Sequence, residues 1–497
     1  MPSALYSFSF EPNSEWTRVL PSSDELWANQ DRVALKYDLK RKMSFGMRVE
    51  RCEWIEESAR WRLTIRHLKT DTILTHESQF LFCASGQLVK PREMDVPGSE
   101  TFKGPIFHTA RWRTDVDLTD KKVVVFGNGC TAAQVVPAII GKVKSLTQFV
   151  RAKHWMMPPI DREVPDIAHL VLRWLPGAMG LQRLLVFAAA ENSLRGFPLT
   201  EAARRFRSNQ RVKSERYMRE AAPAKYHDLL IPDFEVGCKR RIFDSGYLKS
   251  LHAENLTLTD EKAVEIVPEG VRTAGGDVVE ADVVVLANGF VTNDFLIGMD
   301  VRGYGGKTIQ EHWASFGGAE AYNCSVLSGF PNMFILLGPN AATGHTSAVM
   351  ASENSINYAL RVLRPVLEGR ASVADLKWEA EKVYSDKLQA ALRDTVWNSG
   401  CQSWYVKDAG DDSGETWNAM SYPWSQAHFW YRSLFPVWSD WEYRVSCFST
   451  MDTSVFEHLL IQCSRAELQG RGRVLDGRCL RLPLALRLYP ASSGRGV

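Results

Sequence analysis

The sequence has almost no net charge, no closely spaced cysteine pair and no glycine before Gly46. Basic and acidic residues are interspersed and leave a formal charge of +2, which argues against nucleic-acid binding. Nine cysteines without a CxxC pair suit reduced thiols in a cytoplasmic protein better than a disulfide framework or a zinc site. Because the first 45 residues lack glycine, we expect no glycine turn for a dinucleotide phosphate there.

Long hydrophobic runs are also missing. The most apolar segment, residues 175–194, contains Arg183 and falls short of a membrane-spanning helix. We interpret this segment as a buried or amphipathic helix in preference to a membrane contact. Residues 1–16 show neither the basic nor the apolar region of a secretory signal. We therefore expect a cytoplasmic protein without a membrane span.

Strand and helix patterns alternate along most of the chain. Residues 22–42 begin with a Ser/Asp cap and continue as a predicted helix, and the period then shortens to that of strands up to Gly86. Three β-branched, non-alternating runs are typical of buried parallel strands; they are residues 120–127, 281–290 and 332–340. A mostly helical insertion is expected at about 155–230. This alternation predicts an α/β fold with doubly wound sheets.

The segment GNGCTA directly follows the predicted strand at 120–127 and precedes a predicted helix at about 130–142. Gly127 permits a tight turn, Gly129 lets the backbone approach a pyrophosphate, and Ala132 keeps the helix close to the strand. The free N–H groups of the helix N-terminus then face the phosphates. We predict dinucleotide binding here, against the alternative of a plain helix-packing turn. The predicted binding residues are Gly127, Asn128, Gly129, Cys130, Thr131, Ala132 and Ala133.

The end of the next strand distinguishes NAD from NADP. An NAD site places an acid there to hold the ribose hydroxyls. This chain has Arg151 and Lys153 and no acid at that position. Cations at this point would pair with a 2′-phosphate, which predicts a preference for NADPH. The alternative is a pair of solvated surface charges.

The segment FKGPIFHTARW has the spacing FxGxxxHxxxW, with Phe102, Gly104, His108 and Trp112 at the named positions. It resembles the identifying motif of the Baeyer–Villiger monooxygenases, a branch of the flavin-containing monooxygenases. The resemblance covers roughly residues 3–445. Further matching segments are YSFSFEPN at 6–13, FCASGQLVKP at 82–91, GCKRRIFDSGYL at 237–248, LANGF at 286–290, GPNAATGH at 338–345 and GCQSWY at 400–405.

The resemblance implies two Rossmann-like dinucleotide-binding domains, one for FAD and one for NADPH. We expect an FAD domain that is incomplete at its N-terminus at 1–119 and an NADPH domain, with the helical insertion, at 120–290. The chain would return to the FAD domain at 291–445. Residues 446–497 show no clear periodicity and are left unassigned. The FAD loop GxGxxG, which stands first in this family, is expected to be missing.

Residue roles carried over from the family begin with Lys239, which would meet the NADP phosphate. Arg240 would lie over the flavin beside the nicotinamide as the catalytic residue, because a guanidinium stabilises anionic oxygen in a dry site. Without the family, these cations would be interpreted as a solvated basic run. Tyr6 and Val49 match positions on the flavin side. Gly86 and Gly289 match glycine turns where the chain crosses between domains.

The implied reaction inserts one oxygen atom of O₂ beside the carbonyl of a small ketone, with NADPH and FAD as cofactors. One alternative is oxygenation of nitrogen or sulfur. Another is a truncated NADP-binding remnant without catalysis, because the FAD loop is not found. The substrate and the oligomeric state are not legible from the sequence.

Overall fold

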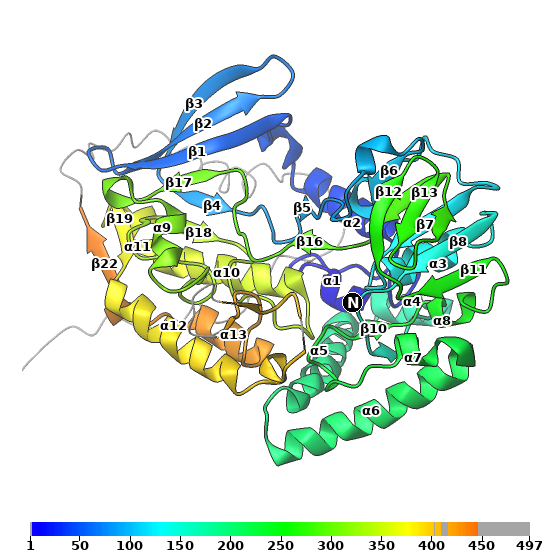
Figure 1. Ribbon diagram of the computed structural model, residues 1–497. Helices are drawn as coiled ribbons and strands as arrows, with labels where there is room; N and C mark the ends of the chain where they lie inside the picture. The colour runs from blue at the N-terminus through cyan, green and yellow to red at the C-terminus, as the bar shows by residue number, and fades with distance from the viewer. Residues whose placement is uncertain (1, 402, 409–415, 446–497) are drawn as a thin grey trace, which may run out of the picture. The chain divides into compact units, whose positions relative to one another are not determined.

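The computed structural model describes residues 2–401, 403–408 and 416–445. The predicted phosphate loop follows one strand of a five-stranded parallel sheet (Figure 1). Its strand order is β11-β8-β7-β15-β6. The strands are β6 (Ile106–His108), β7 (Lys122–Phe126), β8 (Ser145–Phe149), β11 (Leu256–Thr259) and β15 (Val283–Leu286). All four pairings are parallel, as the apolar runs predict. The first strand, β6, precedes the expected boundary at residue 119 and still joins this sheet.

The two faces of this sheet are covered differently. Val123 and Val125 of β7 pack with helix α3 (Ala132–Ile139) in one core cluster. Val124 and Phe126 pack on the opposite side, because successive strand residues point to opposite faces. That side is covered by a three-stranded antiparallel meander of β12 (Ala263–Val267), β13 (Gly270–Thr273) and β14 (Val278–Glu280).

The insertion is mainly helical, as expected. Its helices are α4 (Asp166–Trp174), α5 (Ala178–Glu191), α6 (Glu201–Ala221) and α7 (His227–Leu230), followed by α8 (Tyr247–Ser250). Two short parallel strands, β9 (Met156–Met157) and β10 (Ile242–Phe243), pair across it.

The apolar segment at 175–194 contains all of helix α5, and the expectation that this helix is buried is wrong. None of the residues of α5 is buried, and Leu181, Leu184 and Leu185 are 58–62% exposed. Among the described helices, none taken singly is long and apolar enough to cross a membrane; α4 and α5 together reach that measure only across a 114° bend.

The N-terminal part forms a helix and an antiparallel sheet. Helix α2 (Ser23–Lys36) starts at the predicted cap, where the Ser22 side chain accepts a hydrogen bond from the Glu25 N–H, but ends before residue 42. Strands β1 (Met47–Ile55), β2 (Arg60–His67) and β3 (Thr72–Ser78) follow, and β17 (Asp300–Arg302) joins β1 in parallel. The last predicted strand before Gly86 does not join these four strands and belongs to a different sheet.

That different sheet has two strands within the described residues. Strand β4 (Leu81–Cys83) pairs in parallel with β18 (Met333–Ile335). Beyond Gly86, β5 (Lys90–Pro91) pairs with β16 (Phe290–Val291), so the two predicted crossing segments run side by side. The remaining strands are β19 (Val373–Leu376) with β22 (Trp441–Arg444) and β20 (Lys407–Asp408) with β21 (Thr416–Trp417). The other helices are α1 (Ser3–Tyr6), α9 (Ile309–Ala314), α10 (Ala348–Val362), α11 (Arg364–Leu367), α12 (Trp378–Arg393) and α13 (Gln426–Leu434). The predicted tail at 446–497 lies outside the described residues.

Candidate functional site: a dinucleotide cleft at the sheet switch point

A cleft of about 2000 Å³ opens at the carboxyl ends of β7 and β15. The chain leaves β7 toward β8 and β11 on one side, and β15 lies on the other side of β7. In open α/β sheets this reversal of strand order leaves a crevice in which ligands bind. Gly127 follows β7 and Gly289 follows β15, and both line the cleft.

The first glycine turn is built so that only glycine fits. Gly127 has φ of 102°, and a Cβ atom there would lie 2.5 Å from the Ala287 carbonyl oxygen. The Gln148 side-chain amide donates to the Gly127 carbonyl at 2.8 Å and fixes the turn. At Gly129 an added Cβ would meet no atom within 4 Å, so this side of the loop is open. The two glycines therefore differ in function: one makes the turn and the other leaves space.

Backbone N–H groups at the start of α3 are free to bind an anion. The N–H groups of Gly129, Cys130, Thr131 and Ala132 donate to no acceptor among the described residues. Unpaired N–H groups at a helix N-terminus attract phosphate. Ala132 is fully buried and does not line the cleft, whereas its neighbour Ala133 does.

Only one of the two predicted cations after β8 lines the cleft. Arg151 lines the cleft and donates from Nη1 to Asp95 Oδ2 at 2.9 Å, while Lys153 is not among the lining residues. Asp95 also lines the cleft, and the sequence reasoning missed this acid because it lies 56 residues earlier in the chain. Both partners of the pair are mostly exposed, at 72% and 60%, so the ion pair itself is weak.

Lys239 and Arg240 both line the cleft but have different surroundings. Arg240 is exposed and has no hydrogen bond or ion pair within the described residues. Lys239 is partly buried with Nζ 4.8 Å from the centre of the Phe234 ring, and burial lowers the pKa of Lys239. A simple solvated basic run would not bury one of its lysines against a ring.

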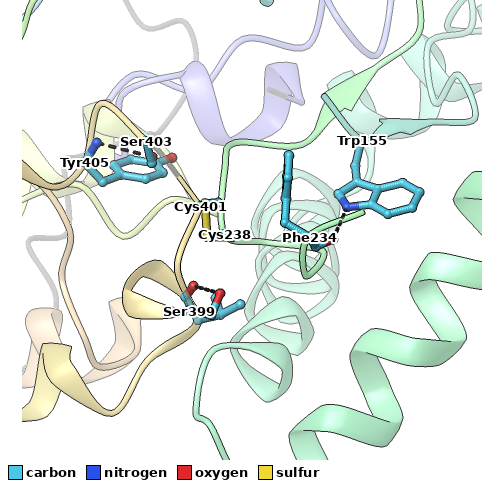
Figure 2. Close-up of a disulfide and its surroundings, with 8 residues drawn as sticks. Trp155, Phe234, Cys238, Ser399, Cys401, Ser403 and Tyr405 are labelled. Atoms are coloured by element: carbon cyan, nitrogen blue, oxygen red, sulfur yellow. Dashed lines mark hydrogen bonds between the residues drawn. A yellow bond between two sulfur atoms is a disulfide. The ribbon is translucent and has the colours of Figure 1, made fainter. Parts of the chain in front are cut away.

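A disulfide between Cys238 and Cys401 holds this loop (Figure 2). It corrects the expectation that all nine cysteines are reduced thiols. The two residues are 163 positions apart, and their Cα atoms lie 6.2 Å apart, within the normal range for a disulfide. Spacing along the sequence gave no sign of the pair, because only the fold brings the two segments together. The loop with Lys239 and Arg240 is thereby tied to the GCQSWY segment.

His154 is a cleft residue that the sequence reasoning missed. Burial lowers the pKa of His154 to about 4, and the charge of Lys239 adds to the shift. The imidazole is therefore neutral near pH 7. Its place three residues after Arg151 was the available signal, since loop residues that follow a strand at the switch point face the ligand crevice.

His108 of the FxGxxxHxxxW motif lies outside the cleft lining. Its Nδ1 accepts from the Ala110 N–H at 3.0 Å, so the proton resides on Nε2, which donates to the Gly289 carbonyl at 3.0 Å. Burial lowers the pKa of His108 and favours this neutral form. Gly104 lies so close to Asp282 that a Cβ atom would contact the Asp282 carbonyl oxygen at 2.0 Å. The motif thus fastens the edge strand to the crossing segment and takes no direct part in the cleft.

Of the residues that the family resemblance places on the flavin side, only some line the cleft. Tyr6 lines the cleft. Val49 lies in β1 and packs against a hydrophobic core cluster, and Gly86 follows β4; neither is among the lining residues. Gly86 has φ of 79°, which agrees with a glycine turn.

The chain resembles known monooxygenases over most of its length, although no protein-family model matches it. A Baeyer–Villiger monooxygenase from Streptomyces coelicolor is 33% identical over 414 residues, which is 82% of this chain and 78% of the relative. A second, from Pseudomonas aeruginosa, is 29% identical over 84% of this chain and 78% of the relative. The FAD-binding monooxygenase ktnD of Aspergillus niger is 29% identical over 82% of this chain and 68% of the relative.

Solved structures show the same fold. OTEMO in complex with FAD and NADP has a TM-score of 0.76 at 22% identity and covers 89% of this chain and 90% of its own. Cyclohexanone monooxygenase from Rhodococcus sp. Phi1, bound to NADP⁺, has a TM-score of 0.76 at 22% identity and covers 89% of each chain. The α/β fold with two dinucleotide-binding domains, expected from the sequence, is confirmed by this match. On its sequence relatives, the chain belongs to the Baeyer–Villiger monooxygenases.

Proposed function

We propose that this chain is an FAD- and NADPH-dependent monooxygenase that inserts one oxygen atom of O₂ next to the carbonyl of a ketone. The observation that carries the proposal is the phosphate cradle at Gly127–Ala132, whose free N–H groups open toward a cleft with Arg151, Lys239 and Arg240 on its walls. A dinucleotide needs both features, since N–H groups hold a pyrophosphate and cations hold further phosphate charge.

The cleft offers groups that can hold the phosphates of NADPH. The free N–H groups after Gly127 would hold the pyrophosphate. Arg151 would pair with the 2′-phosphate, and Asp95 competes for the same guanidinium. Lys239 would add further positive charge from the wall of the cleft. Neutral His154 adds no competing charge at pH 7.

Arg240 is the cation best suited to act on the substrate. It lines the cleft, and within the described residues no acid neutralises it. A guanidinium keeps its proton at any physiological pH, so it would hold negative charge that develops on a carbonyl oxygen. The disulfide Cys238–Cys401 limits the motion of the loop that carries it.

The described residues fit the nicotinamide dinucleotide better than the pyrophosphate of FAD. Strand β4 runs past Gly86 into β5 without a helix, and α10 begins only thirteen positions after β18 ends. The glycine turn at Gly86 therefore does not open a helix, unlike the turn at Gly127. Flavin would supply the activation of O₂, and the family, not this geometry, supports its involvement.

One experiment separates the candidates. The full chain is purified, its visible absorbance is recorded for bound flavin, and it is incubated with FAD, NADPH, a cyclic ketone and an aryl methyl sulfide. We expect little flavin in the chain as purified and a lactone after FAD is added. A sulfoxide without lactone would replace ketone oxygenation with heteroatom oxygenation. NADPH binding with neither product would instead support an NADP-binding protein without oxygenation.

A further inference from the structure

Three ionisable side chains meet in the protein interior, outside the cleft. His312 comes from α9, Glu320 from the loop that follows it, and Glu381 from α12. His312 Nε2 lies 3.0 Å from Glu381 Oε1 and 3.5 Å from Glu320 Oε1. Their side chains are 2%, 2% and 0% exposed. None of the three is among the described residues that line the dinucleotide cleft.

The charges of this group are not balanced by the protein. No lysine or arginine of the described residues forms an ion pair with either carboxylate. Both carboxylate oxygens of Glu320 are buried and have no hydrogen-bond partner there. Burial strongly disfavours an unpaired carboxylate, so a buried pair of them beside one imidazole calls for a further positive group or a proton.

We propose that His312, Glu320 and Glu381 bind one divalent transition-metal ion of the zinc class as a closed structural site. Two carboxylates and a neutral imidazole make the complex electrically neutral with M²⁺. Three donor atoms lie within 4.8 Å of one another, namely His312 Nε2 and one carboxylate oxygen each of Glu320 and Glu381, and the unpartnered carboxylate of Glu320 could bind through both oxygens as one bidentate ligand. Ligands held at about 2.0–2.2 Å from zinc in a tetrahedral arrangement lie about 3.4 Å from one another. The observed 3.0 and 3.5 Å agree with that separation.

The surroundings hold the ligands in place, as at known metal sites. The Ser328 N–H donates to Glu381 Oε2 at 3.0 Å, which directs Oε1 toward the group. The Trp313 indole donates to the Glu320 backbone carbonyl at 2.9 Å and fixes its loop. Three aromatic rings surround His312 at centroid distances of 5.3–5.8 Å and limit access of water; they belong to Phe316, Phe330 and Trp378. A metal here would join α9 and its loop to α12.

The competing explanation is a proton shared between Glu320 and Glu381, and Glu320→Gln distinguishes the two. Gln keeps the size of Glu and tolerates the shared-proton arrangement, but it removes the charge and one donor oxygen that a metal requires. The full chain and its variants are dialysed and their metal content is measured by inductively coupled plasma mass spectrometry. We expect one zinc-class ion per chain and at least a tenfold lower content in Glu320→Gln.

Two further measurements keep the test sharp. Exposed Glu379 on the same helix supplies the control Glu379→Gln, which should keep the metal. Replacement by Co²⁺ should produce visible absorption bands in the unmutated chain that His312→Gln removes, with no assay of oxygenation needed. A chelator should lower Tm in the unmutated chain and leave Glu320→Gln unchanged. The proposal would be overturned if the unmutated chain contained no metal and added zinc did not raise its Tm.

Discussion

The Nε2–H of His108 donates to the carbonyl oxygen of Gly289 at 3.0 Å and joins the motif strand to the crossing segment. Gly289 lines the cleft and His108 does not. A change at His108 can therefore reach the dinucleotide through the backbone of Gly289 and through the Phe290 ring, which lines the cleft and packs edge-on against the imidazole at a centroid distance of 5.4 Å. The role of the motif can therefore be tested separately from the roles of the residues that line the cleft.

For His108→Ala we expect a stability loss of about 1–3 kcal/mol, since a partly buried carbonyl loses its donor. NADPH affinity should change little, while NADPH-dependent turnover falls, because the crossing segment is no longer fixed. Urea unfolding and nucleotide titration measure the two effects separately. A large loss of NADPH affinity with normal stability would place His108 in the binding site instead.

Arg151→Ala should weaken NADPH binding by about 1.5–3 kcal/mol, the cost of one charge-assisted contact, and should hardly affect NADH. Asp95→Asn should act in the opposite direction, because it frees Arg151 from its present partner. Lys153→Ala is the matched control, since Lys153 is not among the cleft-lining residues, and it should leave both affinities unchanged. Fluorescence titration with each nucleotide gives the comparison. Equal affinity of the unmutated chain for NADPH and NADH would argue against a 2′-phosphate site.

Arg240→Ala should reduce oxygenation by about 10²-fold or more, as removal of one donor to a developing oxyanion does. Arg240→Lys should restore only part of the activity, because an ammonium lacks the planar fork of the guanidinium. Product formation from a ketone is followed with FAD and NADPH in excess. Lys249→Ala, an exposed cation on α8 away from the cleft, serves as control. Full activity of Arg240→Ala would remove this residue from catalysis.

Loss of the Cys238–Cys401 disulfide should cost about 2–4 kcal/mol of stability, because the open loop gains conformational freedom in the unfolded chain. Cys238→Ser, Cys401→Ser and the double variant should be equally destabilised, since any one of them removes the whole bond. Mass spectrometry without reductant counts the thiols, and thermal unfolding measures stability. Additive losses in the double variant would show that the two residues act separately.

His154 makes stability depend on pH below neutrality. Its pKa is about 4 in the folded chain against an ordinary value of 6.5, so between these values only the unfolded chain binds the proton. Stability should therefore fall as the pH drops from 6.5 toward 4, by at most about 3.5 kcal/mol, given about 1.4 kcal/mol per pKa unit. His154→Gln should flatten this part of the profile. Identical profiles for the unmutated chain and His154→Gln would contradict this assignment.

The sequence by itself determined the local features of the nucleotide-binding half. The valines of β7 predict a strand buried on both faces, and the GNGCTA segment predicts a glycine turn before a helix, because both depend on neighbouring residues. The cap at Ser22 is local for the same reason. The motif spacing also identified the family, which the relatives confirm.

Only the tertiary structure decided which distant residues meet. Asp95 reaches Arg151 across 56 positions, Cys401 reaches Cys238 across 163, and Glu381 reaches His312 across 69. Arg151 and Lys153 look equivalent in the sequence, yet only Arg151 lines the cleft. Periodicity reports on a single element, whereas these contacts arise from the packing of several elements against one another, and that packing leaves no signal in the spacing along the chain.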